Sequence, residues 1–148
     1  MKQRYLASIR LLAQCYQAFE QISAAHVRSF NLTPSQFDII ATLGNTDGMT
    51  FGELGQKTLI TKGTMTGVVD RLEAKGLVKR ITGPEDRRST IVKLTKAGER
   101  EFERTFGAHI EFCKDKFTGY SEEDFAALDR ELAKLKSSLT ESLARLKT

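Results

Sequence analysis

Along most of its 148 residues this chain repeats apolar side chains at the spacing of an α-helix, and the pattern is interrupted once. The interruption consists of two short extended runs, residues 77–82 and 89–94, which flank the polar sequence GPEDRR. Two such runs joined by turn residues predict a β-hairpin with a charged tip. Only two prolines occur in the chain, which is compatible with long helices on both sides of the hairpin. We therefore expect a mainly α fold with one small β-hairpin, in the α+β class.

Capping residues mark the ends of the expected helices. The helices are expected at residues 3–30, 34–43, 51–57, 61–75, 96–117 and from 122 onward. Four of them have the N-caps Thr33, Thr50, Thr95 and Ser121, and Gly76 is expected to end the fourth helix in a left-handed conformation. A helix-turn-helix followed by a hairpin is the order of a winged helix-turn-helix, here over residues 31–95. The whole length, 1–148, fits a single domain, with helical segments 1–30 and 96–148 on either side.

The positive charge of the chain is concentrated on the fourth helix and the hairpin. Residues 57–93 hold nine basic and four acidic side chains, a net charge of +5. The remaining residues hold fourteen basic and fifteen acidic side chains, a net charge of −1. A basic run is often no more than a solvated face. Because this one coincides with a helix-turn-helix and a hairpin, it predicts binding to double-stranded DNA, with affinity that falls as salt rises.

On a helical wheel, residues 61–75 divide into an apolar and a polar face. The apolar face, expected to pack in the core, consists of Met65, Val68, Val69 and Leu72. The candidate DNA contacts of this helix are Thr61, Lys62, Gly63, Thr64, Thr66, Gly67 and Arg71. Threonines can reach phosphates or base edges, and the helix N-terminus offers N–H groups to a phosphate. The two glycines reflect either local tolerance or close approach of the backbone to a groove floor.

The hairpin tip carries both basic and acidic candidates. Arg87 and Arg88 suit a narrow minor groove, whose negative potential attracts arginine. Asp86 would repel phosphate, so we expect it to organise the turn or to hold an arginine. Asp70, on the exposed face of the fourth helix, is likewise expected to neutralise an arginine.

Two stretches, LITKGTMTGVVDRLEAKGLVKR at residues 59–80 and GPEDRRSTIVKLTKAGER at residues 83–100, resemble the MarR family of transcription regulators. The resemblance implies a homodimeric winged helix that binds a pseudo-palindromic operator, usually as a repressor released by a small aromatic or phenolic ligand or by an oxidant. It implies that the helix from Thr61 reads the major groove. Asp86 and Arg88 match the signature of the family's wing, and Asp70 matches an acidic residue that pairs with the wing arginine. We therefore predict an Asp70–Arg88 pair.

The last helix carries a leucine stripe with steps of three and four residues, typical of a coiled coil. Packing within the chain is one explanation of this stripe, and dimerisation is the other. The resemblance favours a dimer interface made by the two terminal helices. Its expected residues are Leu6, Ile9, Leu132, Leu135, Leu139 and Leu143.

The effector site is the least constrained feature. The resemblance implies a ligand pocket lined by Phe19, His26, Phe30, Phe37 and Phe112, although aromatic residues at helical spacing are also typical of an ordinary core. Both cysteines are expected to be reduced and buried. Redox sensing through Cys15 and metal sensing through His109 and Cys113, at i and i+4, are the alternatives. No cofactor or metal is expected.

Several classes of protein are disfavoured by the sequence. It contains no Gly-rich phosphate loop, G-x-S-x-G, H-E-x-x-H or C-x-x-C motif, so we do not expect an enzyme. No apolar run approaches the ~20 residues of a membrane span, and no signal peptide is visible, so a cytoplasmic location is expected. A winged-helix module that binds only proteins is the remaining alternative to a DNA-binding regulator.

Overall fold

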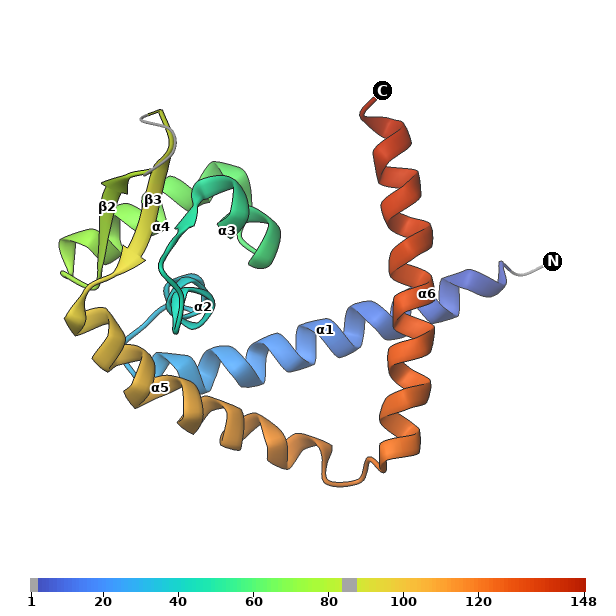
Figure 1. Cartoon of the computed structure of the whole chain (residues 1–148). Helices are drawn as coiled ribbons and strands as arrows, with labels where there is room; N and C mark the ends of the chain where they lie inside the picture. The colour runs from blue at the N-terminus through green and yellow to red at the C-terminus, as the bar shows by residue number, and fades with distance from the viewer. Residues whose placement is uncertain (1–2, 84–87) are drawn as a thin grey trace. The chain divides into compact units, whose positions relative to one another are not determined.

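The computed structural model describes residues 3–83 and 88–148. Its elements are, in order, α1 (Arg4–Arg28), α2 (Pro34–Leu43), β1 (Met49–Thr50), α3 (Phe51–Lys57), α4 (Lys62–Ala74), β2 (Val78–Thr82), β3 (Thr90–Leu94), α5 (Lys96–Lys114), the 3-10 helix η1 (Asp115–Phe117) and α6 (Glu122–Leu146) (Figure 1). The mainly α fold with a small sheet is the one that the sequence predicts. Packing within the chain divides it into two units, residues 1–112 and 113–148, which are described separately.

Local capping explains where most helices begin. Reciprocal capping boxes, in which the N-cap hydroxyl and the N3 side chain each accept a backbone N–H, start α2, α3 and α6. The residue pairs are Thr33 with Gln36, Thr50 with Glu53, and Ser121 with Asp124. Gly76 has a φ of 75° and follows the end of α4, which confirms its role as a left-handed C-terminal residue.

The sheet has three strands rather than the two expected. Strands β2 and β3 form the predicted antiparallel hairpin, with Val78 opposite Leu94 and Thr82 opposite Thr90. The two-residue strand β1 pairs antiparallel with the other edge of β3, so the strand order is β1-β3-β2. A two-residue strand has no detectable alternation of apolar and polar residues, which is why the pattern did not predict it.

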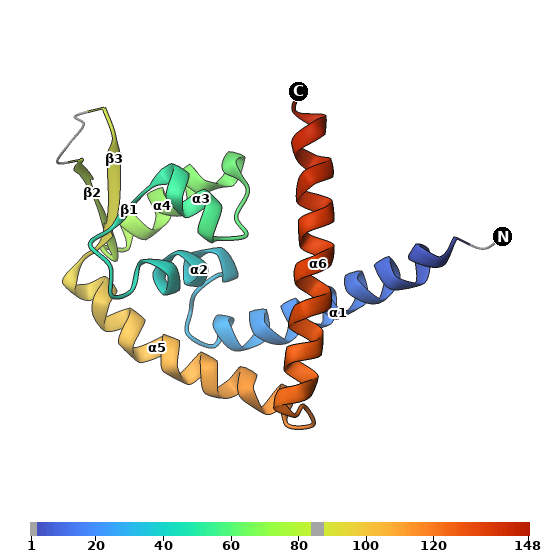
Figure 2. The same ribbon diagram turned by 45° about the vertical axis from the view of Figure 1, so that its right-hand side comes forward.

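The apolar core lies where α2, α3, α4 and the sheet meet (Figure 2). Its members with almost no exposed surface include Ile39, Ile40, Leu43, Leu54, Val69, Leu72, Val78 and Val92. Helix α1 joins this core through its C-terminal end, where Val27 is buried. The helix-turn-helix and the sheet therefore bury a core of their own, and this core holds the polar face of α4 in place.

A tight joint connects the end of α4 to the start of α5. The side chain of Thr95 donates to the carbonyl oxygen of Gly76 at 2.6 Å and accepts from the Gly98 N–H at 3.1 Å. The Thr95 N–H donates to the carbonyl oxygen of Leu77 at 3.0 Å. A Cβ atom at position 98 would overlap that same carbonyl oxygen, so only glycine fits there.

The second unit consists of η1 and α6. Helix α6 has 25 residues, and none of them is buried. Its leucine stripe is present as predicted but is largely open to solvent. Within the described residues, no helix combines the length and the apolar character that crossing a membrane requires.

Candidate nucleic-acid interface

Helix α4 presents the two faces that the sequence predicts. Met65, Val68, Val69 and Leu72 are buried, with 0–7% of each side chain exposed. The candidate contacts Thr61, Lys62, Gly63, Thr64, Thr66 and Arg71 are exposed, and Gly67 is half-buried. The core therefore fixes the rotation of α4 about its own axis. Its polar face points away from the protein and is available to a partner.

The two glycines of this face do not owe their presence to packing inside the chain. A Cβ atom added at Gly63 or at Gly67 would meet nothing within 4 Å. A helical glycine costs about 1 kcal/mol relative to alanine. Since no neighbour within the described residues requires glycine at these positions, close approach of an external surface remains a specific explanation.

The start of α4 differs from the starts of α2, α3 and α6. The side chain of its N-cap residue, Thr61, accepts no hydrogen bond from the backbone of α4. Its hydroxyl instead lies 2.9 Å from the hydroxyl of Thr64. The first N–H groups of a helix have no acceptor within that helix. The Thr64 N–H donates to the carbonyl oxygen of Thr61 at 3.1 Å, so without a side-chain cap the N–H groups ahead of it are the ones available to an anion such as a phosphate.

Asp70 pairs with a different arginine from the one predicted. Its carboxylate accepts from the guanidinium of Arg80 at 2.5 Å, so the prediction of an Asp70–Arg88 pair is wrong. Arg80 also donates to Glu73 at 3.1 Å, and its guanidinium lies 5.7 Å from the ring centre of Phe51. The hydrogen bond from Arg80 to Asp70 raises the pKa of the guanidinium. The physical reason is position: Arg80 lies on β2, the strand that follows α4 directly.

The Arg80 cluster, which comprises Arg80, Asp70, Glu73 and Phe51, connects three elements. Phe51 belongs to α3, the two acids to α4, and the arginine to β2. The role that the sequence assigns to Asp70, to neutralise an arginine within the basic face, stays compatible with this geometry. The sequence identifies Arg80 only as one of the basic residues, because nothing in its sequence neighbourhood distinguishes it from an arginine that contacts phosphate.

The predicted contacts at the hairpin tip are only partly described. Asp86 and Arg87 lie outside the described residues. Arg88 is exposed and lies two residues before the start of β3 at Thr90. The Gly83 N–H donates to the carbonyl oxygen of Ser89 at 3.0 Å, which extends the ladder beyond the Thr82–Thr90 pair.

The aromatic residues predicted to bind a ligand gather around a pair of histidines. Nδ1 of His26 lies 2.9 Å from Nδ1 of His109, and Nε2 of His109 lies 3.0 Å from the hydroxyl of Ser23. The ring of His26 stacks on Phe112 with the centroids 4.1 Å apart and meets the edge of Phe30 at 4.9 Å. Burial and, to a smaller extent, repulsion from His26 lower the pKa of His109.

The aromatic cluster, defined as His26, Phe30, Phe37, His109 and Phe112, contains four of the five predicted ligand residues. Phe37 contacts His109 with the centroids 4.8 Å apart. The fifth predicted residue, Phe19, is 44% exposed on α1. The sequence suggests His109 only as half of a metal site. Its i+3 spacing to Phe112 places both residues on one face of a helix, and this is the signal that connects His109 to the predicted ligand residues.

The two cysteines have different environments. Cys15 is exposed, so the expectation of two buried thiols is wrong for this residue, and almost all residues of α1 before Ser23 are exposed as well. Cys113 is half-buried, and burial raises the pKa of its thiol, which disfavours the reactive thiolate. Across the described part of the chain, no group of three or more His, Cys, Asp or Glu side chains is placed to hold a metal ion.

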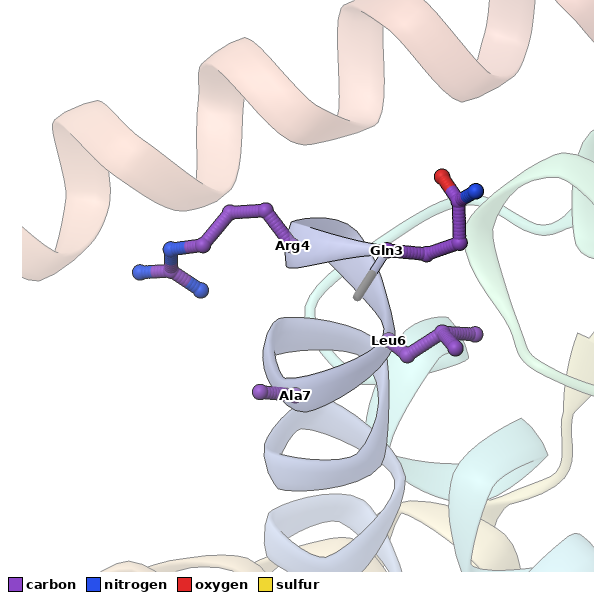
Figure 3. A pocket seen from close by; sticks show the side chains of 4 residues that line it. All are labelled: Gln3, Arg4, Leu6 and Ala7. Atoms are coloured by element: carbon purple, nitrogen blue, oxygen red, sulfur yellow. The ribbon is translucent and has the colours of Figure 1, made fainter. Parts of the chain in front are cut away.

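A pocket lies at the start of α1, where Gln3, Arg4, Leu6 and Ala7 line it (Figure 3). Figure 3 shows Gln3 and Leu6 on one side of the helix and Arg4 and Ala7 on the other. None of these four residues belongs to the set predicted to bind a ligand. Leu6 is instead one of the predicted dimer contacts.

The predicted dimer contacts are mostly open to solvent in the single chain. The exposed fractions are 55% for Leu6, 40% for Ile9, 42% for Leu132, 50% for Leu139 and 52% for Leu143. Leu135 is half-buried. Apolar side chains left exposed along a helix in this way are typical of a protein–protein contact.

A helix-turn-helix with an outward polar helix, followed by a basic hairpin, defines the chain as a winged helix-turn-helix DNA-binding protein. Residues 32–90 match the model of the MarR family. The chain is 32% identical over 123 residues to the HTH-type transcriptional regulator YcgE of Bacillus subtilis, covering 83% of this chain and 80% of the relative. The chain therefore belongs to the MarR family and is a DNA-binding transcriptional regulator, not an enzyme.

Two further similarities concern regulation. The homoprotocatechuate degradative operon repressor of Escherichia coli is 33% identical over 78 residues, which cover 53% of each chain. A solved structure, that of BpsR of Bordetella bronchiseptica, has a TM-score of 0.79 and 24% identity, covering 92% of this chain and 97% of that one. BpsR is described as a protein whose DNA binding is regulated by 6-hydroxynicotinic acid. At this level of identity, the likeness to BpsR shows the fold alone.

Proposed function

We propose that this regulator is a cytoplasmic homodimer that represses transcription from a pseudo-palindromic operator and is released by a small aromatic or phenolic ligand. In this proposal α4 lies in the major groove, where Lys62, Arg71 and the threonines contact phosphates and bases. Arg87 and Arg88 of the hairpin reach the adjacent minor groove. Asp70 and Asp86 organise the basic face and do not contact DNA.

The observation that carries the DNA-reading role is the outward face of α4. This face combines exposed Lys62 and Arg71 with two glycines that nothing in the described chain requires. It also begins at a helix N-terminus whose N-cap side chain accepts no backbone hydrogen bond. Each of these features suits close contact with a phosphate backbone and a groove.

Dimerisation is supported by apolar surface on two helices. Helix α1 exposes Tyr5, Leu6, Ile9, Leu11 and Tyr16, and α6 exposes Leu128, Leu132, Leu139, Leu143 and Leu146. Burying a leucine side chain stabilises a structure by about 1.5–3 kcal/mol. A two-fold dimer places its recognition helices about one turn of DNA apart, which accounts for a pseudo-palindromic operator.

Repression and ligand release are supported by the relatives and by the aromatic cluster. One relative is named a repressor of an aromatic-acid degradation operon, and BpsR responds to an aromatic acid. In this chain, rings of α1, α2 and α5 meet at His26 and His109. Stacked rings beside imidazole nitrogens can hold a planar ligand that carries a hydroxyl or a carboxylate.

The test of DNA reading is selection of bound sequences from a random DNA pool. The expected result is a palindrome whose half-sites are about one helical turn apart, with affinity that falls steeply as salt rises. Recovery of an asymmetric single site would contradict the dimeric operator. A gel shift on the DNA upstream of the chain's own gene then shows whether that site occurs there.

The test of ligand release uses 6-hydroxynicotinate and homoprotocatechuate as probes on the recovered operator. Wild-type protein is expected to release the DNA with at least one of these aromatic acids. Phe112→Ala should lose this response, because the ring that stacks on His26 is gone. Phe19→Ala is the matched control and should respond as wild type, since Phe19 lies outside the aromatic cluster. Release that survives Phe112→Ala would place the ligand elsewhere.

A further inference from the structure

The turn of the helix-turn-helix, residues 58–61, satisfies its backbone N–H groups in two ways. The Thr58 N–H donates to the carbonyl oxygen of Leu54 at 2.9 Å. The Ile60 N–H donates to the Thr58 hydroxyl at 3.4 Å. These partners come from the turn itself or from α3. The Leu59 N–H instead donates to Oδ2 of Asp38, on α2, at 3.1 Å.

Leu59 depends on this hydrogen bond more than its neighbours do. Thr58 and Ile60 are buried, with 7% and 9% of their surfaces exposed. The side chain of Leu59 is 80% exposed, so it contributes little packing that would hold the middle of the turn. Thr61, the N-cap of α4, follows two residues later. The Asp38 carboxylate therefore fixes the backbone immediately before the helix that faces DNA.

The carboxylate of Asp38 is held at this place at a cost in desolvation. Its side chain is half-buried, and burial raises the pKa of the carboxyl by more than the hydrogen bond from Leu59 lowers it. Asparagine would offer an acceptor at the same place without desolvating a charge. The carboxylate also acts on α1, where burial, Glu20 and Asp38 together raise the pKa of Tyr16.

We propose that Asp38 is a positioning residue for DNA recognition, whose carboxylate holds the turn before α4 so that the first turn of α4 meets the operator in register. This inference rests on the proposed reading of DNA by α4. Asp38 itself does not contact DNA in this arrangement. Its loss should therefore weaken binding to the operator while binding to unrelated DNA is retained, because the latter depends on charge and not on register.

Two substitutions in the full-length chain separate the hydrogen bond from the fold. Asp38→Leu removes the acceptor and keeps a similar size, and Asp38→Asn retains an acceptor oxygen. We expect Asp38→Leu to bind the selected operator duplex about tenfold more weakly, the order of one lost charge-assisted hydrogen bond. Binding to a scrambled duplex, and the salt dependence of both, should not change. Asp38→Asn should restore most of the operator affinity, and Ser35→Ala, on the same helix, should match wild type.

A second measurement uses the wild-type protein alone, so it requires neither DNA nor a substituted protein that folds correctly. In an NMR titration of the wild-type protein, the Leu59 amide resonance should shift as the Asp38 carboxyl is protonated, at a pH above the ordinary range for aspartate. The inference is overturned if the Leu59 amide resonance does not shift in this titration. It is also overturned if Asp38→Leu loses affinity for the operator and for the scrambled duplex equally. If the wild-type chain selects no operator, the proposed function fails instead, and the titration still decides whether Asp38 holds the turn.

Discussion

Helices α4 and α6 each have one apolar and one polar face, but the fold treats them in opposite ways. The apolar residues of α4 are buried in the core, and its polar face is exposed. Helix α6 has no buried residue, and its leucines are exposed along most of its length. The difference shows which contacts the single chain completes. The helix-turn-helix buries its apolar face within the chain, whereas the apolar face of α6 stays exposed.

The largest expected effect concerns α6. Leu139→Glu combined with Leu143→Glu places two carboxylates on the leucine stripe, so the dimer should dissociate. Operator affinity should then fall by about 100-fold or more, because a monomer contacts a single half-site. Sedimentation and gel shift measure the two effects. Lys134→Glu, on the opposite face of α6, is the matched control. A double variant that stays dimeric would remove the contrast between α4 and α6.

The next effect concerns the Arg80 cluster, which holds the hairpin against α4. Arg80→Gln should weaken operator binding about tenfold, because the hairpin loses its two carboxylate contacts on α4. The free energy of unfolding should fall by no more than about 1 kcal/mol, since the pairs are partly exposed. Lys79→Gln removes the same charge one residue earlier and should instead reduce the salt dependence of binding. Equal behaviour of the two variants would make Arg80 a simple phosphate contact.

A smaller effect concerns the glycines of α4. Gly63→Ala and Gly67→Ala should each raise the free energy of unfolding by about 0.5–1 kcal/mol, because the added methyl meets no neighbour. Operator affinity should fall in both variants if the DNA approaches the backbone closely. Gly55→Ala on α3 has the same open surroundings and should gain stability without losing affinity. Unchanged affinity in all three variants would favour local tolerance of glycine.

The smallest expected effect concerns α1. The first half of this helix exposes apolar residues, as α6 does, and its C-terminal end is held to α5 by the His26–His109 pair. The pKa of His109 lies below its ordinary value of 6.5 because of burial and His26. As the pH falls below 6.5, the unfolded chain therefore takes up this proton before the folded chain does. Urea denaturation should show stability that is constant above this pH and declines below it.

Substitution of His109 provides the control for this pH dependence. His109→Gln should flatten the decline below pH 6.5, since the group that titrates is gone. Ser23 and His26 are the polar partners that the structure gives to the His109 ring nitrogens, so Ser23→Ala should keep the decline. An unchanged slope in His109→Gln would assign the proton uptake to other groups.

Most of the fold could be predicted from the sequence because its signals are local. Capping boxes need residues only three positions apart, and the buried face of α4 follows from a single helical wheel. The polar contacts that arrange the site are not local. His26 and His109 are 83 residues apart in sequence, and Asp38 and Leu59 are 21 apart. Helix and strand patterns are recognised within short windows of neighbouring residues, so they cannot indicate pairs that are this far apart in sequence.

Two errors have the same origin. The partner of Asp70 was assigned from the resemblance to a family, and the structure gives Arg80 ten residues away. Composition predicts a buried Cys15 because thiols usually are buried, but only the C-terminal end of α1, at Ala24 and Val27, is buried in the single chain. Both outcomes depend on tertiary geometry, which composition and periodicity do not specify.

The joint at Thr95 has a mechanical consequence. Thr95 is bonded to Gly76 and Leu77, and Gly98 packs against Leu77 without room for a side chain. Hinges in proteins are short segments free to change their backbone angles, and this joint has its backbone groups engaged. The first turn of α5 and the last turn of α4 should therefore move together as one rigid body. A tilt of α5 at this end should then be transmitted directly to α4.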